Sequence, residues 1–169
     1  DRRMIERGGL ILHCAYIEYH GKGILFSAPS GVGKSTQAAL WEKYRNSVTV
    51  NGDRALLRKK EGKWLACAWP VCGSSQICKR VDVPVHAIVM LRQGKKNSVM
   101  RLSPIEAFRQ LYPQVTVNQW NPEFVQAAIN GIEDLILQVP VWQLICDISE
   151  EAVQCLENVL FPNDTAKVR

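Results

Sequence analysis

The stretch FSAPSGVGKSTQ, residues 26–37, has the residue types that a phosphate-binding loop needs. The usual pattern is G-x-x-x-x-G-K-[ST], in which backbone N–H groups surround phosphate, the lysine bridges the β- and γ-phosphates and the hydroxyl binds Mg²⁺. Gly33, Lys34 and Ser35 complete this pattern here, and Ala28 stands in place of its first glycine. That change costs little if Ala28 has ordinary backbone angles. The stretch therefore predicts a nucleotide site.

The surroundings of this loop agree with that function. A short apolar strand, residues 23–28, precedes it, and a helix at residues 34–44 follows it. The N–H groups of residues 31–35 can converge on phosphate at the positive end of that helix. A chance glycine-rich turn and a loop that has lost its nucleotide are the alternatives. The intact lysine and serine favour a working loop.

A second ligand for the metal is expected just past a nearby strand. The sequence SVTVNGD places Asp53 directly after the short strand at residues 47–50. Phosphate-loop enzymes usually hold Mg²⁺ with an acid in such a position. An ordinary turn-forming aspartate is the alternative. We favour the metal ligand, because this is the first strand beyond the loop helix.

The elements that position these residues form a mixed series of strands and helices. We expect hairpins from strands 10–19 and 23–28, from strands 54–60 and 63–69, and from strands 86–93 and 97–102. Their order gives an α/β protein with β-hairpins early and helices late, and not a regular βαβ series. The later elements are helices capped by Ser103 and Asn121, a strand at residues 141–148, and a closing amphipathic helix at residues 149–160 with acids in its first turn.

Composition limits the class of protein. The 169 residues, 47% of them hydrophobic, suit one nucleotide-binding domain with its own core, although the chain lacks an initial Met and could be a piece of a longer one. No apolar run approaches the ~20 residues of a membrane span. The net charge of +5 is scattered, apart from a solvated hairpin tip at residues 57–63, so we expect an anionic small substrate and neither nucleic acid nor membrane.

The cysteines are expected to be reduced. The chain has six of them, none in a C-x-x-C pair and with no secretory signal before them. We therefore predict small buried side chains in a cytoplasmic protein. A zinc site is disfavoured by the wide spacing. Its three candidate ligands would be Cys67, Cys72 and Cys78.

Beyond these local patterns, LHCAYIEYHGKGILFSAPSGVGKSTQ resembles the phosphate-loop region of HPr kinase/phosphorylase. That family shares its core with phosphoenolpyruvate carboxykinase and has a histidine-bearing strand, a Y-G-x-G turn, a second strand and an S-G-x-G-K-S loop. The resemblance is strong over residues 9–59 and fainter to residue 160. The later part looks like HPr-kinase-like proteins of peptide-modification gene clusters.

The resemblance implies a kinase that uses ATP and Mg²⁺ to phosphorylate a serine hydroxyl. It places His13 beside the reacting phosphoryl group, with Lys34 and Asp53 as further catalytic residues. It assigns Ser35 and Asp53 to the metal, with a second role as base open to Asp53. Because related kinases form rings, a homo-oligomer is expected by analogy. The nucleotide-binding residues are Ser30, Gly31, Val32, Gly33, Lys34, Ser35 and Thr36.

Three departures from the family pattern limit what carries over. Its adjacent acids appear here as Gly52 and Asp53, so that one carboxylate is missing. Thr36 replaces the acid that usually follows the K-S pair. The later glycine-rich signature of HPr kinases is also absent, so HPr itself is not the expected acceptor.

The segment WPVCGSSQICKR, residues 69–80, is placed near the same site. Gly73, Ser74 and Ser75 could surround an anion or a peptide end, and Lys79 or Arg80 could neutralise charge in the transition state. An exposed loop with ordinary basic residues is an equal alternative.

Three functions remain open from the sequence. The first is phosphoryl transfer to a hydroxyl of a peptide, protein or small molecule. The second is a carboxykinase-like lyase, which the short chain disfavours. The third is a nucleotide-binding module that has lost catalysis and serves as a partner or scaffold, which the missing acid favours.

Overall fold

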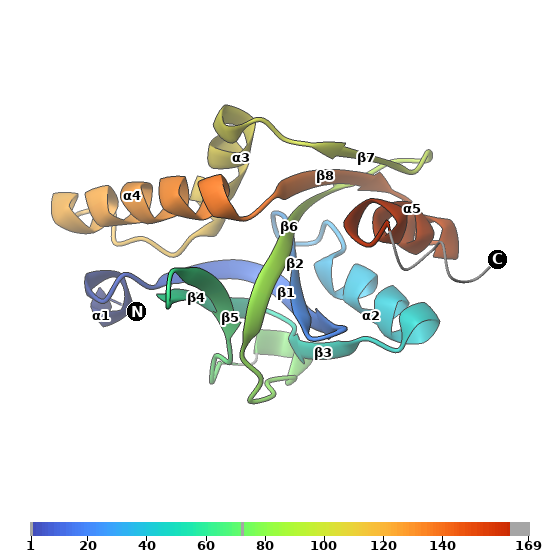
Figure 1. Ribbon diagram of the computed structural model, residues 1–169, viewed down its shortest axis with the longest axis horizontal. Coiled ribbons are helices and arrows are strands. Elements are labelled where there is room, and N and C mark those ends of the chain that lie inside the picture. The colour runs from blue at the N-terminus through green and yellow to red at the C-terminus, as the bar shows by residue number, and fades with distance from the viewer. Residues whose placement is uncertain (1, 72, 163–169) are drawn as a thin grey trace.

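A computed structural model describes residues 2–71 and 73–162, and most of its strands precede most of its helices (Figure 1). Its helices are α1 (Arg2–Glu6), α2 (Lys34–Arg45), α3 (Pro104–Leu111), α4 (Pro122–Gln138) and α5 (Glu150–Leu160), with 3₁₀ turns at Gly73–Ser75 and Tyr112–Gln114. Its strands are β1 (Leu10–Tyr19), β2 (Lys22–Ser27), β3 (Val48–Asn51), β4 (Arg54–Lys60), β5 (Lys63–Cys67), β6 (Val83–Gln93), β7 (Ser98–Arg101) and β8 (Val141–Cys146).

The strands form one mixed, eight-stranded sheet. The hairpins β1–β2 and β4–β5 are antiparallel, as the sequence predicts, whereas β6 runs parallel to both β2 and β8. Since β1 also pairs with β4, and β5 with β6, the pairings of five strands close into a ring. The mixed α/β fold with helices late is thus confirmed.

Both hairpin turns have the backbone that two-residue turns require. His20 and Gly21 join β1 to β2 with φ angles of 51° and 73°, and Glu61 and Gly62 join β4 to β5 with 50° and 78°. Left-handed residues of this kind match the twist of the flanking strands. The charged tip of the second hairpin is exposed, as expected for a solvated turn.

The third predicted hairpin is wrong. Strand β7 pairs antiparallel with β8 and not with β6, because β8 lies between them and pairs in parallel with β6. Buried side chains on β8, among them Leu144, pack into the core, whereas β7 is a short, mostly exposed edge strand. Burial of β8 therefore decides the order of the strands.

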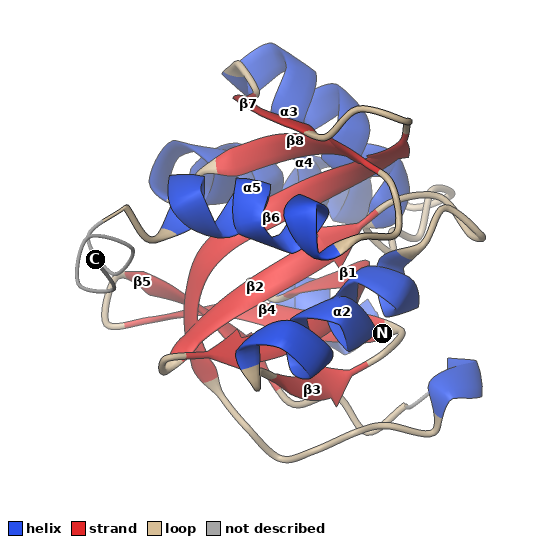
Figure 2. Cartoon of the chain, turned by 90° about the vertical axis from the view of Figure 1, so that its right-hand side faces the viewer, coloured by secondary structure: helices blue, strands red, loops and turns tan. Residues whose placement is uncertain are grey.

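The central strands are buried on both faces, which explains their unbroken apolar runs. On β1, Leu10, Leu12, Cys14 and Tyr16 face one core with α3 and α4, and alternate residues face a second core with α2 and α5. Figure 1 shows α4 on one side of β1 and β6 and α2 on the other, and Figure 2 shows α2 and α5 in front of the sheet.

Both predicted helix caps are present, and a third helix is capped as well. The Ser103 side chain accepts from the Glu106 N–H, and Glu106 reaches back to the Ser103 N–H, which completes a capping box. Asn121 caps α4 and Ser149 caps α5. In the part of the chain that the structure describes, no helix is long and apolar enough to cross a membrane.

The prediction that all cysteines are reduced is wrong for Cys78, which belongs to the described part of the chain. Cys78 is disulfide-bonded, whereas Cys14, Cys67, Cys146 and Cys155 are free. Among the described residues no group of three His, Cys, Asp or Glu side chains could hold a metal ion, which gives no support to a cysteine zinc site. Cys72, the remaining candidate ligand, lies outside those residues.

Candidate functional site

The glycine-rich loop is held between a buried strand and a helix. Strand β2 ends at Ser27, whose hydroxyl donates to the His13 carbonyl at 2.8 Å, so the loop begins at a fixed point. Gly31 and Gly33 have φ angles of 82° and 121°, which side-chain-bearing residues rarely adopt. Ala28 is buried and is not among the residues with positive φ, so its methyl group fits this loop without strain.

The start of α2 leaves its first donors available. Gly33 is the N-cap and contributes no side-chain hydrogen bond to the first turn of the helix. The N–H groups there, together with the helix dipole, form an environment that suits an anion.

Lys34 is the buried cation of the loop. Its Nζ donates to the carbonyls of Ala28 and Pro29 at 3.0 and 3.3 Å. Burial lowers the pKa of Lys34 below its ordinary value, against the opposing influence of Cys14 and Asp53. The two carbonyl bonds fix the ammonium group on the loop, where it can contact an outer phosphate.

The turn between β3 and β4 places Asp53 next to β1. Asn51 is completely buried, and its Oδ1 accepts from the N–H groups of Asp53 and Arg54 at 2.9 and 3.0 Å. The Asp53 carbonyl in turn accepts from the Cys14 N–H at 3.0 Å. The Asp53 carboxylate therefore has a defined position, and it accepts from Arg54 Nε at 3.2 Å.

His13 lies beside this carboxylate. Its Nε2 is 3.8 Å from Asp53 Oδ1, and its Nδ1 is 3.4 Å from Gln114 Oε1. Burial lowers the pKa of His13 below its ordinary value, and the charge of Lys34 lowers it further. The imidazole is consequently neutral at pH 7. In the tautomer that donates from Nδ1 to Gln114, Nε2 carries the lone pair.

These residues share one polar cavity of about 300 Å³, called here the loop cavity. All but one of the predicted site residues contribute to it. The exception is Val32, which lines a neighbouring cavity. The residues of the loop cavity are His13, Ser30, Gly31, Gly33, Lys34, Ser35, Thr36, Gly52 and Asp53.

The loop cavity offers oxygen ligands that fit Mg²⁺. The Ser35 hydroxyl and the Asp53 carboxylate both line it, and a hard divalent cation takes one or two such groups together with phosphate oxygens and water. The remaining cavity residues are a lysine, a histidine, a serine, a threonine and glycines, none of them a second carboxylate. The expected pair of metal ligands is thus brought together.

The segment at residues 69–80 lies against the Asp53 turn. The Asn51 side chain donates to the carbonyls of Trp69 and Val71 at 3.1 and 3.0 Å. A Cβ added to Gly73 would lie 2.6 Å from the Asp53 Cβ, and one added to Gly52 would lie 2.6 Å from the Ser75 Cβ. The segment therefore packs where a second acid at position 52 would need room.

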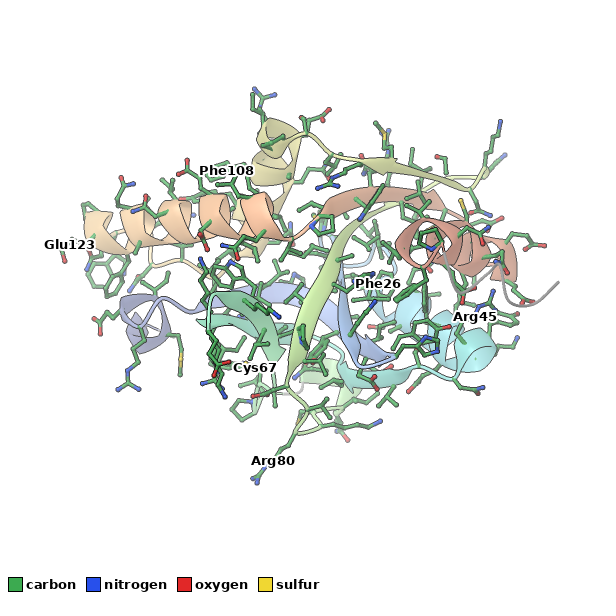
Figure 3. All side chains as sticks on the ribbon, viewed as in Figure 1. Phe26, Arg45, Cys67, Arg80, Phe108 and Glu123 are labelled. Atoms are coloured by element: carbon green, nitrogen blue, oxygen red, sulfur yellow. The ribbon has the colours of Figure 1, made fainter. Side chains whose placement is uncertain are left out.

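The basic residues of this segment face elsewhere. Lys79 and Arg80 line a separate cavity with Trp69 and Pro70 and are not among the residues of the loop cavity. Figure 3 shows the Arg80 side chain extending away from the body of the molecule. This arrangement favours the exposed-loop interpretation for both side chains. The Ser74 side chain lies outside what the structure describes.

Sequence reasoning missed three residues that shape the site. Asn51 organises the turn, Gln114 contacts His13, and Arg54 contacts Asp53 and the Thr116 hydroxyl. An asparagine before glycine is a turn signal that could have revealed Asn51. No local signal marks Gln114, because it reaches His13 from a distant part of the chain.

The chain is similar in fold to a solved structure and matches one family model. The fold is similar to that of the HPr(Ser) kinase/phosphatase from Coxiella burnetii, with a TM-score of 0.50 and 11% sequence identity over 93% of this chain and 96% of that one. The chain belongs to the family described as SynChlorMet cassette protein ScmC, whose model matches residues 2–161. The resemblance to HPr-kinase-like proteins of modification gene clusters is therefore confirmed. No curated protein matches the chain.

Proposed function

We propose that the chain binds a nucleoside triphosphate in the loop cavity and transfers its γ-phosphoryl group to a hydroxyl of a peptide, protein or small molecule. The observation that carries this proposal is the meeting of Lys34, Ser35, Asp53 and His13 in one cavity. Two of these residues begin α2 directly after the loop, and the other two come from β1 and from the turn that precedes β4. Phosphoryl transfer depends chiefly on positioning and charge neutralisation, which such a set can supply.

In the proposed reaction the acceptor oxygen forms a bond to the γ-phosphorus while the bond to the β-phosphate oxygen breaks. The hydroxyl proton passes to His13 Nε2, and the nucleoside diphosphate leaves. Lys34 and the N–H groups of the loop hold the phosphates. Mg²⁺ held by Ser35 and Asp53 would neutralise phosphate charge when bound.

His13 is proposed as the base because it has the right protonation state. Its lowered pKa leaves it neutral, so that it can accept a proton at pH 7. The imidazolium that forms would be stabilised by the Asp53 carboxylate at 3.8 Å. His13 would thus accept the proton in place of the carboxylate that the family pattern has at position 52.

The test is transfer from γ-labelled ATP with Mg²⁺ to peptides encoded in the same gene cassette, followed by mass spectrometry. Lys34→Ala should abolish both triphosphate binding and transfer. The matched control is Lys43→Ala, an exposed lysine on the same helix, which should change neither. Full activity of the Lys34 variant would remove the loop from the mechanism.

A nucleotide-binding module without catalysis is the second candidate. The contact of Ser75 with Gly52 favours it, because this contact leaves no room for a second acid. Tight binding of ATP without transfer to any hydroxyl peptide would support this function over the kinase.

A further inference from the structure

A second cavity, of about 650 Å³, lies beside the loop cavity and is called here the strand-end cavity. We propose that it binds the nucleoside of the triphosphate, with Asp147 and Ile148 as residues that determine affinity for it. This inference rests on the proposed function, because it assigns the other end of the same ligand.

The two cavities are neighbours around one loop. Gly31, Gly33 and Thr36 line both of them. If the outer phosphates of a triphosphate lie at Lys34 in the loop cavity, the rest of the ligand can reach the strand-end cavity by passing these three shared residues. The size is also suitable, since cavities of about 300–1,000 Å³ accommodate small ligands and cofactors.

The strand-end cavity has the position in the sheet that ligand sites favour. Its lining includes the residues that end and follow two parallel strands, Gln93 to Lys95 after β6 and Cys146 to Ile148 after β8. The loop itself follows β2, which is parallel to β6. In α/β sheets ligands bind outside the carboxyl ends of such strands.

Apolar side chains form part of its wall. Leu91 is buried, Val32 is partly buried, and Ile148 is 77% exposed. A large aliphatic side chain left so exposed at the edge of a cavity gains by packing against a ligand. The flat face of a base offers a surface of that kind.

Among the polar groups of the wall, Asp147 is an acceptor held in a fixed position, whereas Lys95 is an exposed cation. The Asp147 carboxylate accepts from Asn97 Nδ2 at 3.1 Å and from the Ser149 hydroxyl, and the Asp147 N–H donates to Asn97 Oδ1 at 3.0 Å. The hydrogen bond from Ser149, and then that from Asn97, lowers the pKa of Asp147, which keeps the carboxylate ionised. A carboxylate fixed in this way suits a ligand with N–H or O–H donors.

Gln37 adds to this pattern. Its Nε2 donates to the Asp147 carbonyl at 3.4 Å and to Cys146 Sγ at 3.2 Å, which connects α2 to the end of β8. Its Oε1 is buried and has no donor among the described residues. Because a buried acceptor normally has a partner, Gln37 Oε1 is a place where a ligand donor would be accepted. Amino groups of a base and hydroxyl groups of a ribose are both donors of the required type.

The test compares the binding of ATP, GTP, 2′,3′-dideoxy-ATP and inorganic tripolyphosphate in the presence of Mg²⁺ by calorimetry. Wild type should bind ATP or GTP at least roughly tenfold more tightly than tripolyphosphate. Ile148→Ser and Asp147→Asn should each reduce that ratio by roughly three- to tenfold and leave tripolyphosphate binding unchanged. The control Leu137→Ser, which changes an equally exposed side chain on α4, should leave every dissociation constant unchanged.

The outcomes separate this inference from the proposed function. Equal binding of ATP, GTP and tripolyphosphate by wild type would overturn the nucleoside site and leave the phosphate site standing. Absence of binding to all four would overturn both. If the effect of Asp147→Asn disappears with 2′,3′-dideoxy-ATP, the carboxylate contacts the ribose, and if it persists, the carboxylate contacts the base; both results support the site.

Discussion

His13 Nε2 lies 3.8 Å from Asp53 Oδ1, although His13 belongs to β1 and Asp53 to the turn between β3 and β4. The distance follows from the antiparallel register of β1 and β4, in which His13 is directly opposite Arg54. Asp53 is the residue before that pair, so it is brought to the same edge of the loop cavity. The pairing of two strands thus joins a neutral imidazole and a carboxylate at one point.

The first prediction is a pH dependence of phosphoryl transfer set by His13. Because burial and Lys34 lower the pKa of His13 below 6.5, the neutral base predominates at pH 7. The transfer rate should therefore be constant above pH 7 and should fall at acid pH, as His13 becomes protonated. Single-turnover rates measured from pH 4.5 to 8 would show this acid limb.

His13→Gln should lower the transfer rate by about 10²–10⁴-fold and remove the acid limb, with little change in ATP affinity. The control is His86→Gln, because His86 contacts the Leu160 carbonyl and is not among the residues of the loop cavity. An acid limb that persists in the His13 variant would assign the base to another group.

The second prediction concerns the stability of the turn that carries Asp53. Asn51 is fully buried and makes four hydrogen bonds, two as acceptor and two as donor. Asn51→Ala leaves those backbone groups without partners and should lower the free energy of unfolding by about 3 kcal/mol. Denaturant unfolding would measure the loss.

The matched control is Asn130→Ala, an exposed asparagine on α4 whose side chain bonds only to Gln126 among the described residues. It should change the free energy of unfolding by less than about 0.5 kcal/mol. Equal losses for the two variants would show that Asn51 does not organise the turn.

The third prediction concerns the departure at Ala28. Because Ala28 is buried and has no positive φ angle, Ala28→Gly should lower the free energy of unfolding by about 1 kcal/mol and should not strengthen triphosphate binding. Gly33→Ala should instead weaken triphosphate binding, because alanine is strained at a φ angle of 121°. Tighter binding by the Ala28 variant would show that the missing glycine impairs the loop.

The contiguous part of the site could be predicted from sequence. Residues 30–36 follow a strand and open a helix, so their spacing alone brings the lysine and the hydroxyl to one loop. Asp53 could be expected nearby because it lies two residues past the end of β3, the first strand after the loop helix. Their grouping in one cavity agrees with that reasoning.

The distant pairings could not be predicted. Strand β7 has the alternating pattern expected of a hairpin partner for β6. In the structure, β8, which comes much later in the chain, pairs with that edge of β6 instead, and this pairing buries Leu144. Gln114 contacts His13 across 101 positions of the sequence, and Asp147 contacts Asn97 across 50. Such contacts depend on the closed sheet and leave no pattern within a short window.

The last prediction tests why the second acid is missing. Gly52→Asp places a Cβ against Ser75, so we expect the single variant to lose about 2–3 kcal/mol of unfolding free energy. Ser75→Gly alone removes, among other contacts, the bond that the Ser75 hydroxyl accepts from the Ile77 N–H at 3.3 Å, and its own loss forms the second side of the cycle.

In the double variant, Gly52→Asp with Ser75→Gly, the space needed by the new side chain is free, so most of the loss should be recovered. The double-mutant cycle would then show a favourable coupling of about 1–2 kcal/mol, as expected for residues in contact. Losses that simply add would mean that Ser75 does not exclude an acid from position 52. If the double variant is stable and also transfers phosphate faster than wild type, the absent carboxylate limits catalysis; if the rate is unchanged, His13 suffices as the base.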